Sequence, residues 1–563
     1  MSVNTSPDVI VVGAGHNGLV AACYLAKSGL DVLVLEAYKT PGGMTSTNPW
    51  PEAPGHFTND ASIQPSVFRT SSIVKDLKLE SKYGLRMRVI DPPHVHMQED
   101  GSSLALWRDP AKTARELEYF SKRDASEYLD MFELIRAAVD IGLPFMHTNP
   151  VHPEFKTILK TLKAAGKNRK QLAAIGRWAA GSFTETVDES FESDIIKAQM
   201  AINLPFMPFF QDGGGWGMIY LGIMSKYGTA MFEGGTGSLP KALIAFLGDH
   251  GGRVRCSAPV EQLLVDAGRV TGVRLDSGEE IRARRGVMTA CSPKTTLTRL
   301  LPKGVLPWKL QARAENIPTR TRGIADMKLD VALSGKITMT KHEQWRGDGV
   351  DLRMGANSTN TWDEAKAAQD ACRRGEIPEH ACGLGQVTTA FAPELAPEGH
   401  DTFWWWSGLT PSDPVDDWDT VRSTLTERAI KHVDKFYVGV EDLQIAARPL
   451  VLPDIEERFH AIDGSVYHVD PLITRFGPRK PAFGFGGYDT PVPGLFLTGS
   501  GTHPVAGISG APGRNAAMRM LHVLKKEAGR ADKLADHRAQ EQATDAALNG
   551  QATEADLVSG PAR

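Results

Sequence analysis

A glycine triplet near the start of the chain constrains the fold more than any other feature of the sequence. Residues 13–18 read GAGHNG, which is the pattern G-x-G-x-x-G. A short apolar run at 8–12 precedes them, and apolar residues at helical spacing follow over 16–28. A second apolar run at 31–36 completes the order strand, glycine turn, helix and strand. This order predicts a βαβ unit of the dinucleotide-binding type.

The residues of the triplet have distinct expected roles in binding a dinucleotide. Gly13 permits the tight turn after the strand, Gly15 lets the backbone approach a pyrophosphate, and Gly18 lets helix and strand pack closely. Ala14 and Asn17 lie between them, at the start of the helix. The unpaired N–H groups of a helix N-terminus favour an anion, so all five residues are expected to bind the cofactor.

The next residues indicate which dinucleotide is bound. Glu36, at the end of the second strand and eighteen residues past Gly18, is placed to accept hydrogen bonds from ribose hydroxyls. A glycine pair follows it, and such a pair lets the chain come close to a ribityl chain and the edge of a flavin. The cofactor-binding residues expected here are Gly42, Gly43, Met44 and Thr45. The sequence therefore predicts FAD rather than NAD.

Three blocks of the chain carry a resemblance to a known family. The run VIVVGAGHNGLVAACYLAKSGLDVLVLEAYKTPGG (9–43) resembles the extended FAD fingerprint shared by amine oxidases, phytoene desaturases and their relatives. GGTGSLPKAL (234–243), with the segment that follows it, resembles the second FAD segment of the phytoene dehydrogenase family. GLFLTGSGTHPVAGISGAPGRNAA (494–517) is similar to that family's C-terminal flavin motif. The branch it resembles most is named after pyridine nucleotide-disulfide oxidoreductase domain-containing protein 2.

The resemblance implies further cofactor contacts. It implies that the backbone at Val260 lies over the adenine, and that Gly499, Ser500 and Ile508 contact the flavin. A helix that begins near Pro512 and is aimed at the flavin pyrimidine would stabilise negative charge on the reduced ring.

The spacing of these blocks predicts the domain organisation. We expect an α/β fold in which a Rossmann-type FAD-binding domain is built from discontinuous segments, 1–75, 231–300 and 481–528. An inserted α+β substrate or cap domain is expected from 76–230 and 301–480, and a polar tail from 529–563.

Composition narrows the function classes and partners. A net charge of −4 over 563 residues gives no general attraction to nucleic acid, so no nucleic-acid partner is expected. The five cysteines form no CxxC pair, so no metal site is expected and a reducing compartment is favoured. We expect a cytoplasmic protein, with peripheral membrane contact and the oligomeric state left open.

The resemblance implies FAD-dependent dehydrogenation or desaturation of a hydrophobic small molecule, isoprenoid-like or cyclic. Reduced flavin would pass its electrons to oxygen, a quinone or another carrier. A flavin-dependent amine oxidase is an alternative because it shares the first fingerprint. A redox-neutral flavin-dependent isomerase is a third hypothesis, and a non-catalytic interaction protein that FAD stabilises is a fourth.

The catalytic residues stay unknown at this level. His503 lies inside the C-terminal flavin motif, and His56 follows the glycine pair. Both are candidates for proton transfer, although shaping the local turn is an equally simple role for His503 and a structural role is favoured for His56.

Apolar side chains in the interior regions are candidates for lining a substrate pocket, although ordinary core packing explains them as well. In one group, 403–406, alternate side chains of a strand would point to opposite faces. The other group comprises Phe206, Met207, Phe209, Phe210, Trp216, Met218 and Tyr220.

A basic stretch at 156–170 has helical spacing and interleaved apolar residues. A basic amphipathic helix suits an anionic membrane surface, and a solvated surface helix is the commoner explanation. Its cations are Lys156, Lys160, Lys163, Lys167, Arg169 and Lys170.

Overall fold

The computed structural model describes residues 6–203, 217–320, 323–504 and 506–530. The chain divides into two compact units, Met1–Ala517 and Met518–Arg563. Five expected pocket residues lie outside the described residues: Phe206, Met207, Phe209, Phe210 and Trp216. Residues 531–563 of the expected polar tail also lie outside them.

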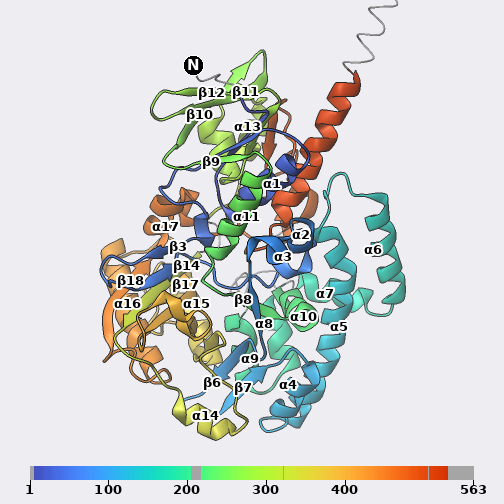
Figure 1. Cartoon of the computed structure of the whole chain (residues 1–563). Helices are drawn as coiled ribbons and strands as arrows, with labels where there is room; N and C mark the ends of the chain where they lie inside the picture. The colour runs from blue at the N-terminus through green and yellow to red at the C-terminus, as the bar shows by residue number, and fades with distance from the viewer. Residues whose placement is uncertain (1–5, 204–216, 321–322, 505, 531–563) are drawn as a thin grey trace, which may run out of the picture. The chain divides into compact units, whose positions relative to one another are not determined.

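A five-stranded parallel sheet forms the centre of the nucleotide-binding part of the large unit, in the order β19-β13-β1-β2-β9. All four residues of β1 are buried, as expected of a strand covered on both faces. The helices α1 (His16–Lys27) and α11 (Ser238–Asp249) pack against each other beside it (Figure 1). The strands are β1 (Val9–Val12), β2 (Val32–Leu35), β9 (Arg253–Arg255), β13 (Gly286–Thr289) and β19 (Leu495–Leu497).

Smaller elements complete this part of the unit. An antiparallel sheet of three strands contains β10 (Val260–Asp266), β11 (Arg269–Leu275) and β12 (Glu280–Arg282). Near it along the chain are α12 (Pro293–Thr295), η4 (Thr296–Leu300) and α13 (Trp308–Glu315). The segment after β2 contains η1 (Gly43–Thr45), the hairpin of β3 (Thr47–Pro49) and β4 (Phe57–Asn59), η2 (Phe68–Thr70), α2 (Ile73–Asp76) and α3 (Leu79–Tyr83).

A second, seven-stranded sheet has the order β18-β14-β17-β16-β15-β6-β7. Its neighbours pair antiparallel except for β15 and β6, which are parallel. Every residue of β14 is buried. The strands are β6 (His94–Met97), β7 (Ser103–Leu106), β14 (Ile324–Leu333), β15 (Asn357–Ser358), β16 (Leu384–Val387), β17 (Asp401–Pro411) and β18 (Gln444–Leu450).

The side chains of β17 alternate between two environments. Phe403 and Trp405 belong to a buried cluster with Leu329 of β14. Trp404 and Trp406 point to the other face, where both line a cavity. The alternation expected for residues 403–406 is therefore present, and it places two tryptophans at the cavity.

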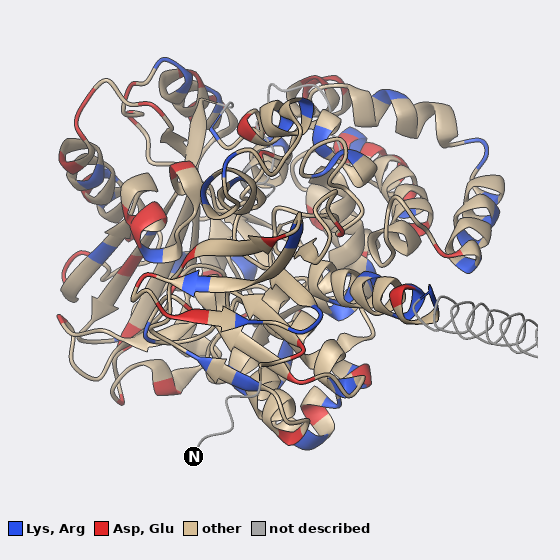
Figure 2. Cartoon of the chain, turned by 90° about the horizontal axis from the view of Figure 1, so that it is seen from above, with Lys and Arg blue, Asp and Glu red and all other residues tan. Residues whose placement is uncertain are grey.

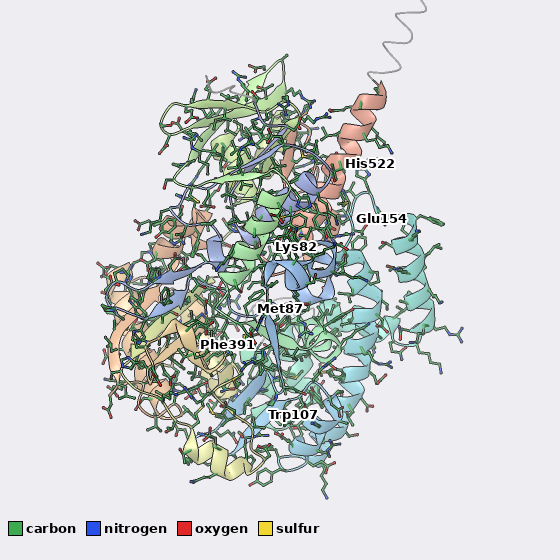
Figure 3. All side chains as sticks on the ribbon, viewed as in Figure 1. Lys82, Met87, Trp107, Glu154, Phe391 and His522 are labelled. Atoms are coloured by element: carbon green, nitrogen blue, oxygen red, sulfur yellow. The ribbon has the colours of Figure 1, made fainter. Side chains whose placement is uncertain are left out.

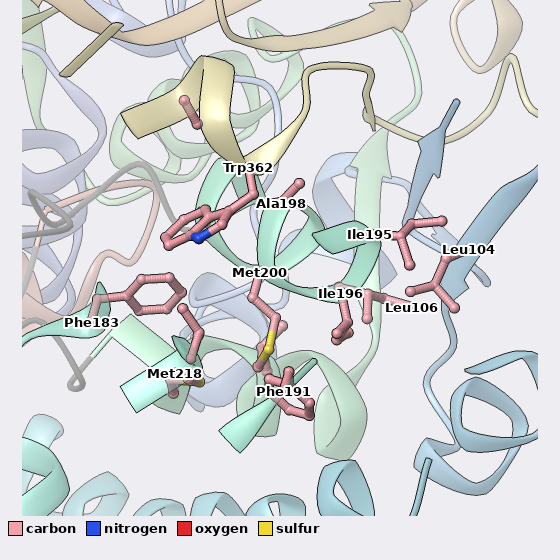
Figure 4. Packing of buried hydrophobic residues seen from close by; sticks show 14 of the residues in the cluster. Leu104, Leu106, Phe183, Phe191, Ile195, Ile196, Ala198, Met200, Met218 and Trp362 are labelled. Carbon is pink, nitrogen blue, oxygen red and sulfur yellow. The ribbon is translucent and has the colours of Figure 1, made fainter. Parts of the chain in front are cut away.

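Helices surround the second sheet. Those nearest to it in sequence are α14 (Thr340–Arg346), α15 (Trp362–Arg373), α16 (Trp418–Asp434) and α17 (Leu452–Phe459). A helical group precedes β8 (Thr229–Phe232): α4 (Pro110–Leu117), α5 (Lys122–Met146), α6 (Phe155–Lys167), α7 (Leu172–Ala180), α8 (Phe183–Ser190), α9 (Asp194–Asn203) and α10 (Ile219–Tyr227). Figure 4 shows part of a core shared by α4, α5, α7, α8, α9, α10 and α15, in which Trp362 of α15 lies near Phe183 and Met200. Met218, expected at the pocket, is buried in this core.

The strands of each large sheet come from different parts of the sequence. The five-stranded sheet takes β1 and β2 from 1–75, β9 and β13 from 231–300, and β19 from 481–528. The seven-stranded sheet takes its strands from 76–230 and 301–480. A further antiparallel pair, β5 (Met87–Ile90) with β8 (Thr229–Phe232), joins two distant segments. A helix over 511–530 follows the last strand, and the boundary between the two units falls within it.

Candidate functional site

A cavity of about 410 Å³ is lined by residues of the first and the C-terminal glycine-rich blocks and by residues 258–260, which follow the second block. Its lining has a glycine-rich part from the five-stranded sheet and its loops, and an aromatic part from the seven-stranded sheet and its neighbours. Of the residues expected to bind the cofactor, those that line the cavity are Gly13, Gly15, Asn17, Gly18, Glu36, Gly43, Met44, Val260, Gly499, Ser500 and Ile508. Ala14, Gly42 and Thr45 are not among its lining residues and lie directly behind them.

The turn between β1 and α1 presents a helix N-terminus to the cavity. The first N–H groups of an α-helix have no partner within the helix. In α1 the N-cap is Gly15, and no side chain accepts a hydrogen bond from these groups. Gly13 is held by a hydrogen bond of 2.7 Å from its N–H to the carbonyl of Leu35. Such a terminus, with unpaired donors and a favourable dipole, is suited to a phosphate.

Two glycines of the motif are needed for different reasons. A Cβ added to Gly18 would lie 2.1 Å from the carbonyl oxygen of Gly13, so no larger residue fits the close approach of helix and turn. A Cβ added to Gly15 would meet no atom within 4 Å. Because Gly15 lines the cavity, the space beside it is open to a bound molecule.

Glu36 is held rigidly by backbone donors. One carboxylate oxygen accepts from the N–H of Ala14 at 2.8 Å, and the other accepts from the N–H of Tyr38 at 2.9 Å. The N–H of Ala258 donates to the carbonyl of Glu36 at 2.9 Å, which brings the segment containing Val260 to the same end of the cavity. Each carboxylate oxygen keeps a lone pair for a ribose hydroxyl.

The glycine pair after β2 folds back onto the first motif. The N–H of Gly42 donates to the carbonyl of Ala14 at 2.9 Å, and Gly42 has a φ of 120°, which favours glycine. The buried hydroxyl of Thr45 donates to the carbonyl of Gly42 at 2.7 Å. These contacts present Gly43 and Met44 to the cavity while Gly42 and Thr45 support them.

The C-terminal block meets the helix N-terminus from the other side. The amide of Asn17 donates to the hydroxyl of Ser500 at 3.4 Å. Gly499, Ser500 and Ile508 line the cavity just before the helix that begins at 511. The two glycine-rich loops therefore enclose one site.

The two histidines proposed for catalysis lie elsewhere. His503 is buried, and its Nε2 lies 3.0 Å from the carbonyl oxygen of Phe145. His56 is buried with its Nε2 at 3.3 Å from the carbonyl oxygen of Leu333. Neither residue lines the cavity.

A histidine that sequence reasoning did not single out lies at the aromatic part of the cavity. His94 of β6 is 1% exposed, and its Nδ1 lies 2.9 Å from the carbonyl oxygen of Ala356. Because a carbonyl only accepts, Nδ1 carries the proton, and Nε2 has a free lone pair. Nε2 is buried without a hydrogen-bond partner. A polar residue in a fully buried strand is the signal that would have identified it.

The aromatic part of the cavity, which we call the chamber, is lined by Ile63, Gln64, His94, Tyr220, Ala356, Leu384, Trp404 and Trp406. The indole rings of the two tryptophans stack with their centroids 6.0 Å apart and their planes at 17°. Among these lining residues there is no carboxylate. The chamber therefore suits an apolar molecule that carries little charge.

Burial keeps three histidines of the cavity wall neutral. Burial lowers the pKa of His16, His94 and His468 to about 4 in each case. All three line the cavity. The cations that line it are Arg299 and Arg458, and the guanidinium of Arg458 lies 3.5 Å from the ring centroid of Tyr38.

The lowered pKa values of these three histidines predict that the protein loses stability in acid. Their folded pKa values, about 4, lie below the ordinary value of 6.5, so between these limits the unfolded chain binds protons that the folded chain does not. The free energy of unfolding should therefore be highest above this window and fall as pH decreases through it. We expect the thermal unfolding midpoint to fall from about pH 7 to about pH 5. A midpoint that is constant over this range would contradict the assignment.

Several buried polar atoms on the cavity wall have no protein partner. They include Nε2 of His16, Oδ1 of Asn17 and Nε2 of His94. Buried polar groups are normally hydrogen-bonded, so a bound molecule is expected to meet them. The open space beside Gly15 and the unpaired atoms of His16 and Asn17 show that the residues present fit a dinucleotide cofactor.

Comparison with known sequences gives matches along almost the whole chain. A family model described as flavin containing amine oxidoreductase matches residues 18–521. Pyridine nucleotide-disulfide oxidoreductase domain-containing protein 2 from Mus musculus is 27% identical over 558 residues, covering 92% of this chain and 94% of that protein. A neurosporene-forming phytoene desaturase from Cereibacter sphaeroides is 24% identical over 551 residues, covering 93% and 97%.

Solved structures share the fold. An oxidoreductase from Methanosarcina mazei has a TM-score of 0.58 at 15% identity and covers 91% of this chain and 99% of that one. A putrescine oxidase variant has a TM-score of 0.57 at 16% identity and covers 92% and 99%. The α/β fold predicted from the sequence is that of these structures.

Proposed function

We propose that this chain, which belongs to the family of flavin-containing amine oxidoreductases, dehydrogenates or desaturates a hydrophobic, isoprenoid-like or cyclic substrate. The chain is an oxidoreductase, and its cofactor is FAD. One observation carries the proposal: a single cavity joins the glycine-rich part, where the cofactor is expected, to the apolar chamber. Phytoene desaturases among the relatives support a hydrophobic substrate.

Different residues of the chain bind the cofactor and the substrate. The N-terminus of α1 and Glu36 would hold the phosphate and ribose parts of the cofactor, and Ser500 of the C-terminal loop is hydrogen-bonded to Asn17 at the start of α1. Bound FAD supplies the acceptor for two electrons. The chamber excludes water from the substrate and fixes the orientation of its C–H bonds, which is the main contribution expected of the protein. Oxygen, a quinone or another carrier is proposed as the final acceptor.

Amine oxidation is the second candidate. The stacked pair Trp404 and Trp406 favours it, because indole faces attract cations. The absence of a carboxylate among the described residues that line the chamber disfavours it, since a substrate ammonium would find no counter-charge there.

Anaerobic reduction of the bound flavin tests the proposal. The purified protein is mixed with terpenoid alkenes, cyclic ketones and amines, and the flavin absorbance is followed. Bleaching with an alkene or ketone and formation of a new double bond are expected. Bleaching only with amines, with hydrogen peroxide released in air, would assign amine oxidation instead. If a substrate is converted only after the flavin has been reduced, without net consumption of reductant, the enzyme is an isomerase. If no compound reduces the flavin, a non-catalytic protein is favoured.

The unpaired Nε2 of His94 predicts a substrate preference. As an acceptor in an apolar chamber, it favours a substrate that donates one hydrogen bond. We expect His94→Phe to raise KM for a terpenoid alcohol about tenfold, which corresponds to about 1.4 kcal/mol. The hydrocarbon that lacks the hydroxyl serves as the control substrate, and its KM should change little. Equal effects on both substrates would show that His94 only shapes the chamber.

A further inference from the structure

Helix α6 is unusual because none of its residues is buried, although it spans thirteen residues, Phe155–Lys167. It follows the long helix α5 and packs against it (Figure 1). Helices of globular domains normally bury an apolar stripe against the core. The apolar residues of α6 must therefore have another environment.

The side of α6 that faces the protein consists of small residues. Thr157, Thr161 and Ala164 are half-buried, and Asn168 just past the helix is buried. Their spacing of three and four residues places them on one face. Thr157 lines a cavity together with residues of α5, including Leu143, which confirms the direction of this face. No large apolar side chain of α6 is used for this contact.

The large apolar residues lie on the opposite side. Phe155, Ile158, Leu159 and Leu162 have exposed fractions of 72%, 40%, 51% and 63%. At about 100° per residue they form one stripe, turned roughly 140° away from the face that packs on α5. Figure 3, in which Glu154 marks the start of α6, shows side chains of this helix projecting away from α5.

Positive charge flanks this stripe. Lys156, Lys160, Lys163 and Lys167 form a row along the helix, and α6 itself contains no acidic residue. Within this row Lys160 also lines the cavity beside α5, whereas the other three lysines do not. Over the face that Figure 2 shows, blue and red residues are interspersed, whereas the charged residues of α6 are four lysines. A partner for this surface must be apolar and negatively charged. A second copy would bring the same positive helix against it across a twofold axis, which disfavours self-association.

We propose that α6 lies in the surface of a bilayer that contains anionic lipids. The apolar stripe enters the boundary between headgroups and acyl chains, and the lysines contact lipid phosphates. No helix among the described residues has the length and apolar character to span a bilayer, so α6 provides contact along the surface. Membrane binding by α6 determines where the enzyme works and does not depend on the chemistry of the FAD site.

Sedimentation with lipid vesicles tests the proposal on the full FAD-bound chain. We expect binding to vesicles of phosphatidylcholine with about 30% phosphatidylserine, little binding to phosphatidylcholine alone, and release at high salt. The double variant Phe155→Ser/Leu162→Ser should bind at least tenfold more weakly. Lys156→Gln/Lys163→Gln should bind about 30-fold more weakly to anionic vesicles.

A matched pair of exposed residues provides the control. Trp308 of α13 is 74% exposed and is followed by Lys309, so Trp308→Ser/Lys309→Gln removes a similar apolar and basic pair elsewhere. This variant should bind vesicles like the unaltered protein. The flavin spectrum and the unfolding midpoint should be unchanged in all variants, because every altered side chain is exposed.

Three results would overturn the proposal. They are absence of vesicle binding, equal binding by the α6 variants, and equal binding to neutral vesicles. A dimer that is seen by light scattering without lipid and is lost in Phe155→Ser/Leu162→Ser would assign the stripe to self-association. Flavin reduction in solution is measured separately, so failure of the proposed chemistry would be distinguishable from failure of membrane binding.

Discussion

Replacing Gly15 by alanine is expected to weaken FAD binding about 100-fold, which corresponds to about 2.7 kcal/mol, while the protein stays folded. Gly15 has a φ of −66°, which alanine adopts without strain, and the added Cβ meets no protein atom within 4 Å. The methyl group would instead enter the cavity beside Asn17 and Gly43, where the pyrophosphate is expected. Titration of the apoprotein with FAD, followed by flavin fluorescence, measures the change in Kd.

Two other glycines separate loss of binding from loss of folding. Gly248 of α11 also has no atom within 4 Å of an added Cβ but lies away from the cavity, so Gly248→Ala should bind FAD normally. Gly18→Ala should fail to fold stably, because its Cβ would lie 2.1 Å from the carbonyl oxygen of Gly13. FAD binding by Gly15→Ala that equals the binding by Gly248→Ala would show that the cofactor does not approach this turn.

Residues 8–36 could be predicted in detail because their structure is determined locally. The predicted strand at 8–12 is β1 (Val9–Val12), and the predicted helix at 16–28 is α1 (His16–Lys27). Glycines end the strand and the turn requires them, so short-range chemistry decides both boundaries. The glycine-rich residues of the site were predicted for the same reason.

The sequence places Tyr220 and one face of residues 403–406 among the candidates for lining a pocket, and Tyr220, Trp404 and Trp406 do line the chamber. The rest of the chamber could not be predicted because its residues meet only through long-range pairing. His94 lies on β6, and Trp404 lies on β17, more than three hundred residues later. Alternation along a strand predicts that Trp404 and Trp405 point to opposite faces, but only the packed sheet decides which face meets the cavity. His503 illustrates the converse, since its neighbours in sequence line the cavity and its own ring contacts the carbonyl of Phe145.

A buried ion pair on the same sheet leads to the second large prediction, that Lys328→Met destabilises the protein by about 3–5 kcal/mol. Lys328 and Asp330 of β14 form an ion pair and have side-chain exposures of 1% and 2%. Burial lowers the pKa of Lys328 and raises that of Asp330, and their mutual attraction opposes both shifts. Methionine preserves the volume of the lysine stem but removes the cation that is hydrogen-bonded to the buried Asp330, which then keeps only the attraction of Arg448 on the neighbouring strand β18. The denaturant midpoint of the FAD-bound protein measures the effect.

The pH dependence of this effect has a definite sign. Without the cation, the pKa of Asp330 should be raised further above the ordinary value of 3.8, so that protonation relieves the buried charge. A raised folded pKa gives stability that is present at low pH and lost as pH rises. The difference in unfolding free energy between Lys328→Met and the unaltered protein should therefore be larger at about pH 8 than at about pH 5.

Two further variants decide whether the buried charge is responsible. Lys328→Met/Asp330→Leu removes both charges and should recover most of the lost stability, because an apolar pair of similar volume often replaces a buried ion pair without loss. Lys431→Met breaks the ion pair of Lys431 with Glu427, whose side chains are 61% and 65% exposed, and should change the unfolding free energy by less than about 1 kcal/mol. If Lys328→Met/Asp330→Leu is as unstable as Lys328→Met alone, the two side chains stabilise the protein by their packing and not by their charges. In that case the effect should not depend on pH.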